Sequence, residues 1–251
     1  MKLKKSLKIG ITGGKGFVGS HIAALLKKKG AKLSFFDLPK NDLLKQGNSL
    51  KNFVKNKDAI IHAAAVNRGT DVEIIAGSVV AVYNLISAME KNKSRAKVIF
   101  LSSIQAETET LYGKSKRLAE VVLEDFSNRT KTPVSVFRLT NVFGEDCRPF
   151  YNSVVATFCY QIANGGELTV NPESKNKKIN LIYVGDIAQI ISKEALIRRK
   201  PLFYFKKIES KNEISVGDLA GLIRSFKNRP KLKSKFHKDL YRTYLSYLNG
   251  K

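Results

Sequence analysis

The sequence predicts an α/β fold in which helices cover both faces of a parallel β-sheet. Short apolar runs alternate with longer segments whose apolar residues recur at helical spacing. The clearest unit comes first: an apolar run at 7–12, a glycine-rich turn, an amphipathic segment and a second apolar run at 32–36. The length of 251 residues and the apolar share of 43% are sufficient for a large core. We therefore expect a doubly wound parallel sheet with a small C-terminal lobe.

The turn after the first strand has the spacing of a dinucleotide-binding site. Gly13 permits a sharp exit from the strand, Gly16 lets the backbone approach a pyrophosphate, and Gly19 lets helix and strand pack closely. The N–H groups at the start of the helix that begins near Phe17 then face the phosphates. Asp37 follows the second strand, where its carboxylate can accept from the hydroxyls of an adenosine ribose. These features predict a Rossmann-like unit that binds a dinucleotide.

The rest of the chain continues the alternation. Further strands are expected at 58–64, 97–101, 132–139, 179–184 and 202–205. Helices are expected at 41–57, 71–91, 112–129, 150–164, 186–197 and 215–226. His62 lies inside a strand, so we interpret it as a packed histidine with satisfied hydrogen bonds. We expect residues 1–145 to form the dinucleotide-binding core and 146–251 to form mainly a substrate-binding lobe, interleaved with the core.

A tyrosine and a lysine four residues apart carry the candidate chemistry. Tyr112 and Lys116 fall on one face of a helix that follows a strand ending in Ser102 and Ser103. A neighbouring ammonium lowers the pKa of a phenol and makes it a usable proton donor, while a serine hydroxyl orients the substrate oxygen. The same Y-x-x-x-K spacing recurs at 247–251, but only the first copy follows a strand that ends in serine. We therefore expect the first copy to be catalytic.

Composition narrows the class of protein. The net charge of +24 alone would suggest nucleic acid or an anionic membrane as partner. The basic residues are spread in short clusters without a helix-turn-helix, zinc or RNP-like motif, so nucleic acid is not expected, and no metal site is predicted. Cys147 and Cys159 form neither a C-x-x-C pair nor a disulfide framework, which favours a reducing cytoplasm. Residues 1–8 are basic, but glycines interrupt the apolar stretch that follows, so we expect neither a signal peptide nor membrane insertion.

Several segments resemble a known family. The glycine spacing in TGGKGFVGSHIA resembles the extended branch of the short-chain dehydrogenase/reductase superfamily, the NAD-dependent epimerase/dehydratase family. SSIQA followed by YGKSK, and RLTNVFGEDCRPFYNSVVATFCYQIANG at 138–165, are similar to one group within it. That group is the capsule and O-antigen UDP-2-acetamido-2,6-dideoxy-hexos-4-ulose reductases of N-acetyl-L-fucosamine precursor synthesis, and INLIYVGDIAQII continues the match. The resemblance assigns the catalytic triad to Ser103, Tyr112 and Lys116, with Ser102 as a possible substitute.

The resemblance implies reduction of the C4 keto group of a UDP-linked 4-keto-6-deoxy-N-acetylhexosamine by NAD(P)H. The alternatives are a nucleotide-sugar 4-epimerase or dehydratase of the same superfamily, a non-catalytic cofactor-sensing regulator, and a nucleic-acid-binding protein. Dehydratases of this fold need a carboxylate pair directly after the catalytic serine or threonine, whereas Ser103 is followed by Ile, Gln and Ala at 104–106. Glu107 and Glu109 lie further along the loop, where an inward turn of either carboxylate stays open.

Two observations on the cofactor disagree. Asp37 would repel the 2′-phosphate of NADP and favours NAD, whereas the resemblance implies NADPH. Lys40 lies close enough in the sequence to offset the carboxylate charge, so the preference for NAD is weak. The residues expected to contact the cofactor are Gly13, Gly16, Phe17, Val18, Gly19, Asp37, Ala63, Ala64 and Lys116.

Substrate and partners are predicted from the later segments. Asn141 lies just beyond the end of a strand, where ligands bind in parallel sheets, and Arg148 can meet a diphosphate by bidentate hydrogen bonds. With Ser103 they are the expected substrate contacts. The apolar circumferences of the helices at 71–91 and 112–129 suggest a homodimer with a four-helix bundle at its interface, as in extended reductases. The resembling enzymes carry a further, cupin-like domain for epimerisation that this chain does not contain, so we expect a separate epimerase upstream.

Overall fold

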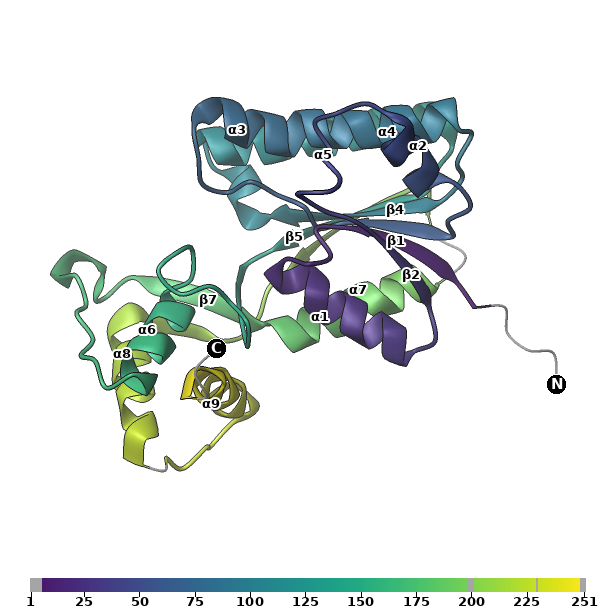
Figure 1. The fold of residues 1–251 in the computed structure, drawn as a ribbon. Helices are drawn as coiled ribbons and strands as arrows, with labels where there is room; N and C mark the ends of the chain where they lie inside the picture. Colours follow the sequence, from purple (N-terminus) through teal and green to yellow (C-terminus); the bar gives the residue numbers. More distant parts are fainter. Residues whose placement is uncertain (1–5, 198–200, 229, 249–251) are drawn as a thin grey trace. The chain divides into compact units, whose positions relative to one another are not determined.

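The chain forms two compact units, shown in Figure 1. The computed structural model describes residues 6–197, 201–228 and 230–248. The first unit comprises Met1–Leu139 and Ala188–Ile208, and the second comprises Thr140–Ile187 and Glu209–Lys251. The chain therefore leaves the first unit after β5, returns to it within the helix α7 and leaves it again after β8.

A six-stranded parallel sheet forms the centre of the first unit. Its strand order is β2-β1-β3-β4-β5-β8, and every neighbouring pair is parallel. The strands are β1 (Lys8–Thr12), β2 (Lys32–Phe36), β3 (Ala59–His62), β4 (Lys97–Ser103), β5 (Val134–Leu139) and β8 (Phe203–Ile208). The order reverses between β1 and β3, and ligands of such sheets bind beyond the carboxyl ends of the strands at that point. The predicted doubly wound α/β fold is confirmed.

Helices cover both faces of this sheet. In Figure 1, α1 and α7 lie on one face, and α2, α3, α4 and α5 lie on the other. Their bounds are α1 (Phe17–Lys28), α2 (Asn48–Val54), α3 (Asp71–Ile75), α4 (Ala81–Lys91), α5 (Leu111–Thr130) and α7 (Val184–Leu196). Phe100 of the sheet and Phe126 of α5 are fully buried in the core beneath the second layer. Central strands covered on both sides explain the nearly continuous apolar runs.

The helix predicted at 71–91 is not a regular α-helix throughout. Five residues, Ala76–Val80, form a π-helix between α3 and α4. The segment Asp71–Lys91 is long and apolar enough to cross a membrane by length and composition, but half of its most apolar window is buried inside the structure. Its apolar character is therefore accounted for in large part by packing on the sheet and on α5.

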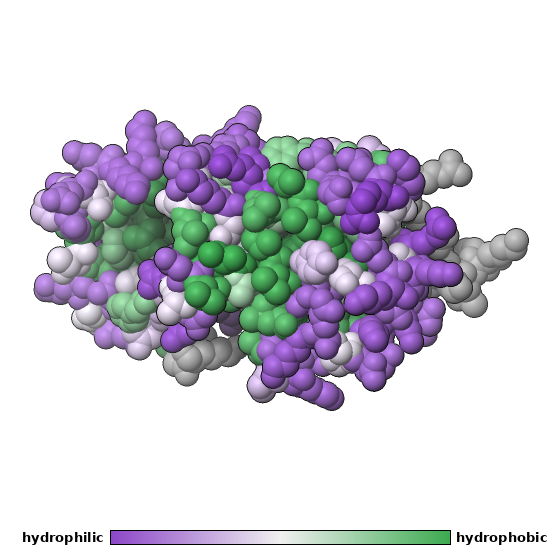
Figure 2. Space-filling model, turned by 90° about the horizontal axis from the view of Figure 1, so that it is seen from above, coloured by the Kyte–Doolittle hydropathy of each residue, from purple (hydrophilic) through white to green (hydrophobic). Residues whose placement is uncertain are grey.

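The outer face of α3, α4 and α5 carries a cluster of exposed apolar side chains. Seen from this side in Figure 2, hydrophobic residues gather in the middle of the face, with charged residues around them. We call this cluster the helix-pair patch. Its members come from α3, α4, α5 and the π-helix between α3 and α4, and they are Val72, Ile75, Val80, Tyr83, Leu111, Leu118 and Val121. A contiguous exposed apolar surface on a soluble protein usually marks an interaction site.

The second unit is built on a three-stranded sheet. Its order is β6-β7-β9, in which β6 (Asn141–Phe143) is parallel and β9 (Glu213–Ser215) antiparallel to the central β7 (Lys178–Tyr183). The helices of this unit are α6 (Val154–Ala163), α8 (Val216–Arg224) and α9 (Lys235–Leu248). The strands β6 and β9 were not predicted, because three residues are too few to show a period.

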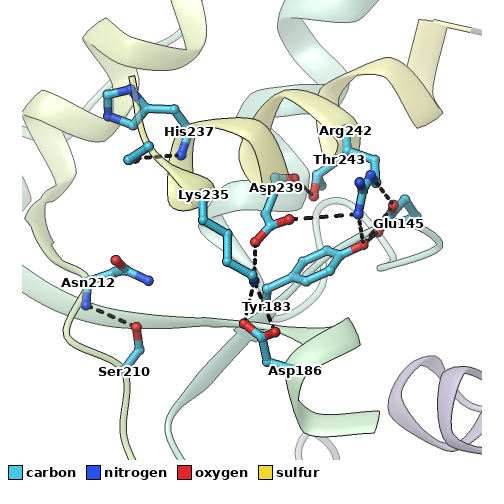
Figure 3. Close-up of polar contacts among 11 residues, drawn as sticks. Glu145, Tyr183, Asp186, Ser210, Asn212, Lys235, His237, Asp239, Arg242 and Thr243 are labelled. Carbon is cyan, nitrogen blue, oxygen red and sulfur yellow. Dashed lines mark hydrogen bonds and ion pairs between the residues drawn. The ribbon is translucent and has the colours of Figure 1, made fainter. Parts of the chain in front are cut away.

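Polar contacts tie α9 to the rest of the second unit (Figure 3). The Lys235 ammonium lies 2.7 Å from carboxylate oxygens of both Asp186 and Asp239. Arg242 donates to the Tyr183 hydroxyl at 3.2 Å. Asp239 is buried, so its ion pair is shielded from solvent on that side. These contacts complement the apolar packing of α9, an element that the sequence analysis did not predict.

Two predicted helices differ in length from those in the structure. Only Asn48–Val54 is helical within the expected 41–57, because the preceding residues form turns rather than a continuous apolar face. The helix expected at 150–164 begins at Val154, where the Ser153 hydroxyl accepts from the backbone N–H of Ala156 at 3.2 Å and caps it. Phe150, just before this cap, has a φ of 57° and cannot begin a helix in that conformation.

Candidate active site

The glycine turn is packed so tightly that side chains are excluded from it. Gly13 has a φ of +71°, and a Cβ on it would lie 2.5 Å from the backbone nitrogen of Ala64. A Cβ on Gly19 would lie 2.0 Å from the carbonyl oxygen of Gly13. Both glycines are therefore needed to bring β1, the start of α1 and the end of β3 together. The structure thus places the backbone of Ala63 and Ala64, two of the residues predicted to contact the cofactor, beside the turn.

The start of α1 has the properties of an anion site. Gly16 is its N-cap, and no side chain caps the helix or contributes an acidic group to its first turn. Phe17 and Val18 are its first two residues, so their backbone N–H groups are among those that a helix leaves without intrahelical partners. These N–H groups and the helix dipole favour a negative ligand such as a diphosphate.

Asp37 follows β2 beside the glycine turn. Burial raises the pKa of its carboxyl group, while the backbone N–H groups of Gly13 and Gly14 and the charge of Lys15 oppose this shift. Among the described residues, its Oδ2 atom is buried without a hydrogen-bond partner. A buried acceptor without a partner is a ready position for a hydroxyl donor.

The three predicted catalytic residues lie together at the carboxyl end of β4. Ser103 is the last residue of β4, and its hydroxyl accepts from the backbone N–H of Gln105 at 3.2 Å and also interacts with the Tyr112 hydroxyl. Tyr112 is the second residue of α5, whose N-cap Thr110 fixes the start of the helix. Lys116 lies one turn later, fully buried, with its Nζ 5.8 Å from the centre of the Tyr112 ring.

The pKa of Tyr112 differs from the sequence-based prediction. The pKa of Tyr112 is raised to about 12 by burial, and the hydrogen bond with Ser103 only partly opposes this. The Lys116 ammonium does not contribute to this shift, so the predicted lowering of the Tyr112 pKa by its neighbouring lysine is wrong, and loss of solvent dominates instead. Burial also lowers the pKa of Lys116 to about 8, against the opposing charge of Glu120. Near neutral pH, Tyr112 is an uncharged phenol and Lys116 is mostly an ammonium.

The two consecutive serines have different surroundings. The Ser102 hydroxyl donates to the Glu120 carboxylate at 2.5 Å, and Arg138 donates to the same carboxylate at 2.5 and 2.9 Å. The Ser103 hydroxyl instead interacts with the Tyr112 hydroxyl, near the start of the same helix α5. The structure therefore brings Ser103 to Tyr112 and engages Ser102 in a buried ion-pair network.

Both glutamates in the following loop are paired with cations. Glu107 accepts from Arg138 at 2.9 Å and from Lys207 at 2.5 Å. Glu109 is highly exposed and lies 3.0 Å from Lys114. The hydrogen bonds from these cations lower the pKa of both carboxyl groups. Neither carboxylate is directed to Tyr112, which answers the question that the sequence left open.

His62 differs from its predicted state. It is buried at the end of β3, with its Nδ1 atom 2.7 Å from the Thr12 hydroxyl. Its Nε2 atom, however, has no hydrogen-bond partner among the described residues, so the histidine is only half satisfied. Burial, and next the charge of Lys116, lower the pKa of His62 to about 3. No motif in the sequence indicated that this histidine lies close to Lys116, because only the pairing of β3 with β4 brings them together.

The expected substrate residues Asn141 and Arg148 belong to the second unit. Asn141 begins β6, and its amide donates to the backbone oxygen of Asn180 at 3.2 Å. Arg148 is exposed, with its guanidinium 5.1 Å from the centre of the Tyr151 ring. The described residues of the whole chain include no cluster of three or more side chains suited to hold a metal ion.

Comparison with known families accounts for this arrangement. A model of the NAD dependent epimerase/dehydratase family matches residues 9–196, which include the glycine turn, Asp37 and the Ser103–Tyr112–Lys116 group. The chain belongs to this family. The predicted family resemblance is therefore confirmed.

Individual proteins and solved structures are also similar to this chain. A UDP-2-acetamido-2,6-beta-L-arabino-hexul-4-ose reductase of Pseudomonas aeruginosa is 34% identical over 96% of this chain. The crystal structure of the capsular polysaccharide assembling protein CapF from Staphylococcus aureus has a TM-score of 0.80 and 31% identity over 96% of this chain. The chain spans 65% of the length of each of these two relatives. The UDP-glucose 4-epimerase of Thermus thermophilus in complex with NAD, with a TM-score of 0.81 and 17% identity, shares the fold.

The residues present fit the cofactor that the name of the epimerase/dehydratase family implies. The glycine turn has no space for a Cβ at Gly13 or Gly19, and this close packing of strand, turn and helix is what the diphosphate site of a dinucleotide-binding unit requires. The buried Oδ2 of Asp37 offers an acceptor for a ribose hydroxyl. Lys116 supplies a buried cation beside the phenol of Tyr112.

Proposed function

We propose that this chain is a nucleotide-sugar reductase, which reduces the C4 keto group of a UDP-linked 4-keto-6-deoxy-N-acetylhexosamine with NADH or NADPH. The observation that carries this proposal is the packing of Ser103, Tyr112 and Lys116 at the carboxyl end of β4, in the same unit as the glycine turn. The 34% identity to a hexul-4-ose reductase supports the choice of reaction. We further propose that the pathway is capsule or O-antigen precursor synthesis in the cytoplasm.

Each catalytic residue has a defined role in this mechanism. Ser103 binds and orients the keto oxygen of the substrate, and Tyr112 donates its phenolic proton to that oxygen as negative charge develops there. A pKa of about 12 keeps Tyr112 protonated at neutral pH, which is the state that a reduction requires. Lys116 stabilises the phenolate that remains and binds the nicotinamide ribose. The bound dinucleotide supplies the hydride.

The carboxylates near Ser103, Tyr112 and Lys116 support a reductase rather than a dehydratase or an epimerase. A dehydratase needs an acid and a base beside the triad to remove the C5 proton and to protonate the leaving hydroxyl. Here the residues after Ser103 are Ile104, Gln105 and Ala106, and the next carboxylates are paired with cations. The proton relay of Tyr112 is sufficient for a keto reduction.

The same proposal covers binding partners. Asn141 and Arg148 of the second unit bind the UDP-sugar, Arg148 by hydrogen bonds to its diphosphate. Two copies of the chain associate through the helix-pair patch and form a homodimer. Neither nucleic acid nor a membrane is a partner. The excess of basic residues increases the local concentration of the anionic substrate.

A screen of UDP-sugars for oxidation of NADH and NADPH tests this function. The substrates are UDP-linked 4-keto-6-deoxy-N-acetylhexosamines that differ in stereochemistry at C3 and C5, assayed in D₂O with and without reduced cofactor. We expect stoichiometric consumption of reduced cofactor and no deuterium at C3 or C5 of the ring. Ring deuterium without cofactor consumption would indicate an epimerase or dehydratase, and cofactor binding without turnover of any substrate would indicate a regulator.

A further inference from the structure

A row of buried side chains joins the glycine turn to Lys116. Thr12, His62 and Phe100 occupy the same register position on the neighbouring strands β1, β3 and β4. In a parallel sheet, side chains at one register position point to the same face. Here it is the face packed against α5, because Phe100 lies in one buried cluster with Ala119, Leu123 and Phe126 of that helix. Thr12 directly precedes Gly13, so the row begins at the turn.

The contacts along this row are continuous. The Thr12 hydroxyl and His62 Nδ1 are 2.7 Å apart, and both residues are almost completely buried. The His62 ring stacks on Phe100 with ring centres 5.6 Å apart and planes inclined by 18°. The Lys116 Nζ lies 5.0 Å from the centre of the same Phe100 ring. The imidazole and the ammonium therefore share one apolar neighbour.

His62 is neutral, so its two nitrogens must differ. If Nδ1 carries the proton, it donates to Thr12 and leaves a lone pair on Nε2. If Nε2 carries the proton, the N–H group at Nε2 turns a partial positive charge toward its surroundings. The nearby Lys116 ammonium disfavours added positive charge on the imidazole. Electrostatics therefore favour the lone pair on Nε2. This atom is the buried acceptor that has no partner among the described residues.

We propose that His62 is a positioning residue for Lys116: its Nδ1–H donates to Thr12, and its Nε2 lone pair accepts a hydrogen bond from the Lys116 ammonium through one buried water. This inference rests on the proposed role of Lys116 in binding and catalysis. Buried waters typically satisfy such otherwise unpaired polar atoms. The arrangement holds the ammonium from the side of β3, whereas Glu120 acts on it from within α5, where Tyr112 is also placed. The imidazole then favours the charged form of Lys116 without adding a charge.

The tautomer can be measured without cofactor or substrate. In a long-range ¹H–¹⁵N spectrum of the whole chain labelled on histidine, we expect His62 to show a protonated Nδ1 and an unprotonated Nε2 from pH 5 to pH 9. The chain contains 3 histidines, and the signal of His62 is identified by its loss in His62→Gln. A protonated Nε2 at neutral pH would overturn the proposal, whatever the enzyme's substrate proves to be.

A second measurement tests the link to Lys116. His62→Phe removes the acceptor, so the alkaline limb of the pH profile of kcat/KM should move to lower pH by about 0.7 unit, the equivalent of one ordinary hydrogen bond. His62→Gln offers an amide oxygen and should restore part of this shift. Thr12→Val removes the hydroxyl that fixes the tautomer of His62 and should also move the alkaline limb to lower pH. Thr12→Ser keeps the hydroxyl and should leave the limb in place. Unchanged limbs in both His62→Phe and Thr12→Val, with the variants folded, would contradict the proposed contact.

Discussion

Glu120 lies one helical turn after Lys116, and its charge raises the pKa of that lysine against the lowering caused by burial. The two effects leave the pKa of Lys116 at about 8. A lysine with this pKa is charged below pH 8 and loses its charge as the pH rises through that value. The charge state of Lys116 therefore depends on its burial and, in the opposite direction, on a carboxylate that is itself held by Ser102 and Arg138.

The first prediction concerns pH. Reductase activity should be retained up to about pH 8 and fall above it, as Lys116 loses its proton. Glu120→Gln removes the opposing charge and should move this alkaline limb to lower pH. Glu124→Gln, one turn further along and exposed, is the matched control and should leave the limb in place. An alkaline limb at the same pH in Glu120→Gln and in the unmodified chain would contradict the electrostatic role.

The second prediction concerns the proton donor. Tyr112→Phe should lower kcat by about two orders of magnitude or more, the typical contribution of general acid catalysis, with little change in cofactor affinity. Lys116→Ala should lower both kcat and the affinity for the cofactor. Tyr247→Phe tests the tyrosine of the other Y-x-x-x-K, whose lysine, Lys251, is outside the described residues. Its hydroxyl donates to the backbone oxygen of Cys147, so that variant should retain turnover. Near-normal turnover in Tyr112→Phe would exclude the proposed mechanism.

The third prediction concerns the glycine turn. Gly19→Ala should abolish measurable dinucleotide binding and lower the melting temperature, because the new Cβ would lie 2.0 Å from the Gly13 carbonyl oxygen. Gly221→Ala in α8 is the control, since a Cβ there meets no atom within 4 Å. That change should leave binding intact and should not destabilise the chain, because alanine is the better helix former. Titration calorimetry and thermal melting measure the two effects, and equal binding by both variants would refute the close-packed turn.

The fourth prediction concerns the choice of dinucleotide. The Asp37 carboxylate should favour NADH over NADPH, because a 2′-phosphate would lie against a buried acceptor. Asp37→Asn should weaken NADH binding and reduce the preference. Fluorescence titrations with both cofactors measure this, and an NADPH affinity in the unmodified chain equal to or better than that for NADH would show that the preference is wrong.

The fifth prediction concerns assembly. The chain should sediment as a dimer at micromolar concentration, and a charge in the helix-pair patch, as in Leu118→Lys, should shift it toward monomer. Leu44→Lys introduces the same charge at a similarly exposed leucine outside the patch and should leave the dimer intact. A monomeric unmodified chain would rule out the proposed interface.

The sequence by itself determined the parts of this protein that depend on local periodicity. Strand, glycine turn, helix and strand at 7–36 follow from apolar spacing and from the conformations that only glycine allows. Tyr112 and Lys116 could be placed on one helix face because i, i+4 spacing fixes that relationship within a single element. The doubly wound α/β architecture, though not the order of its strands, follows from the alternation of elements and the handedness of their connections.

Tertiary structure decided whatever depends on contacts between distant segments. It separated Ser103 from Ser102, because only the packing of α5 on the sheet shows which hydroxyl meets Tyr112 and which meets Glu120. It also paired Glu107 with Arg138 and Lys207, and it placed His62 beside Phe100 and Lys116. Tertiary structure also raised the pKa of Tyr112, because burial depends on the whole fold and cannot be predicted from the spacing of residues along the chain.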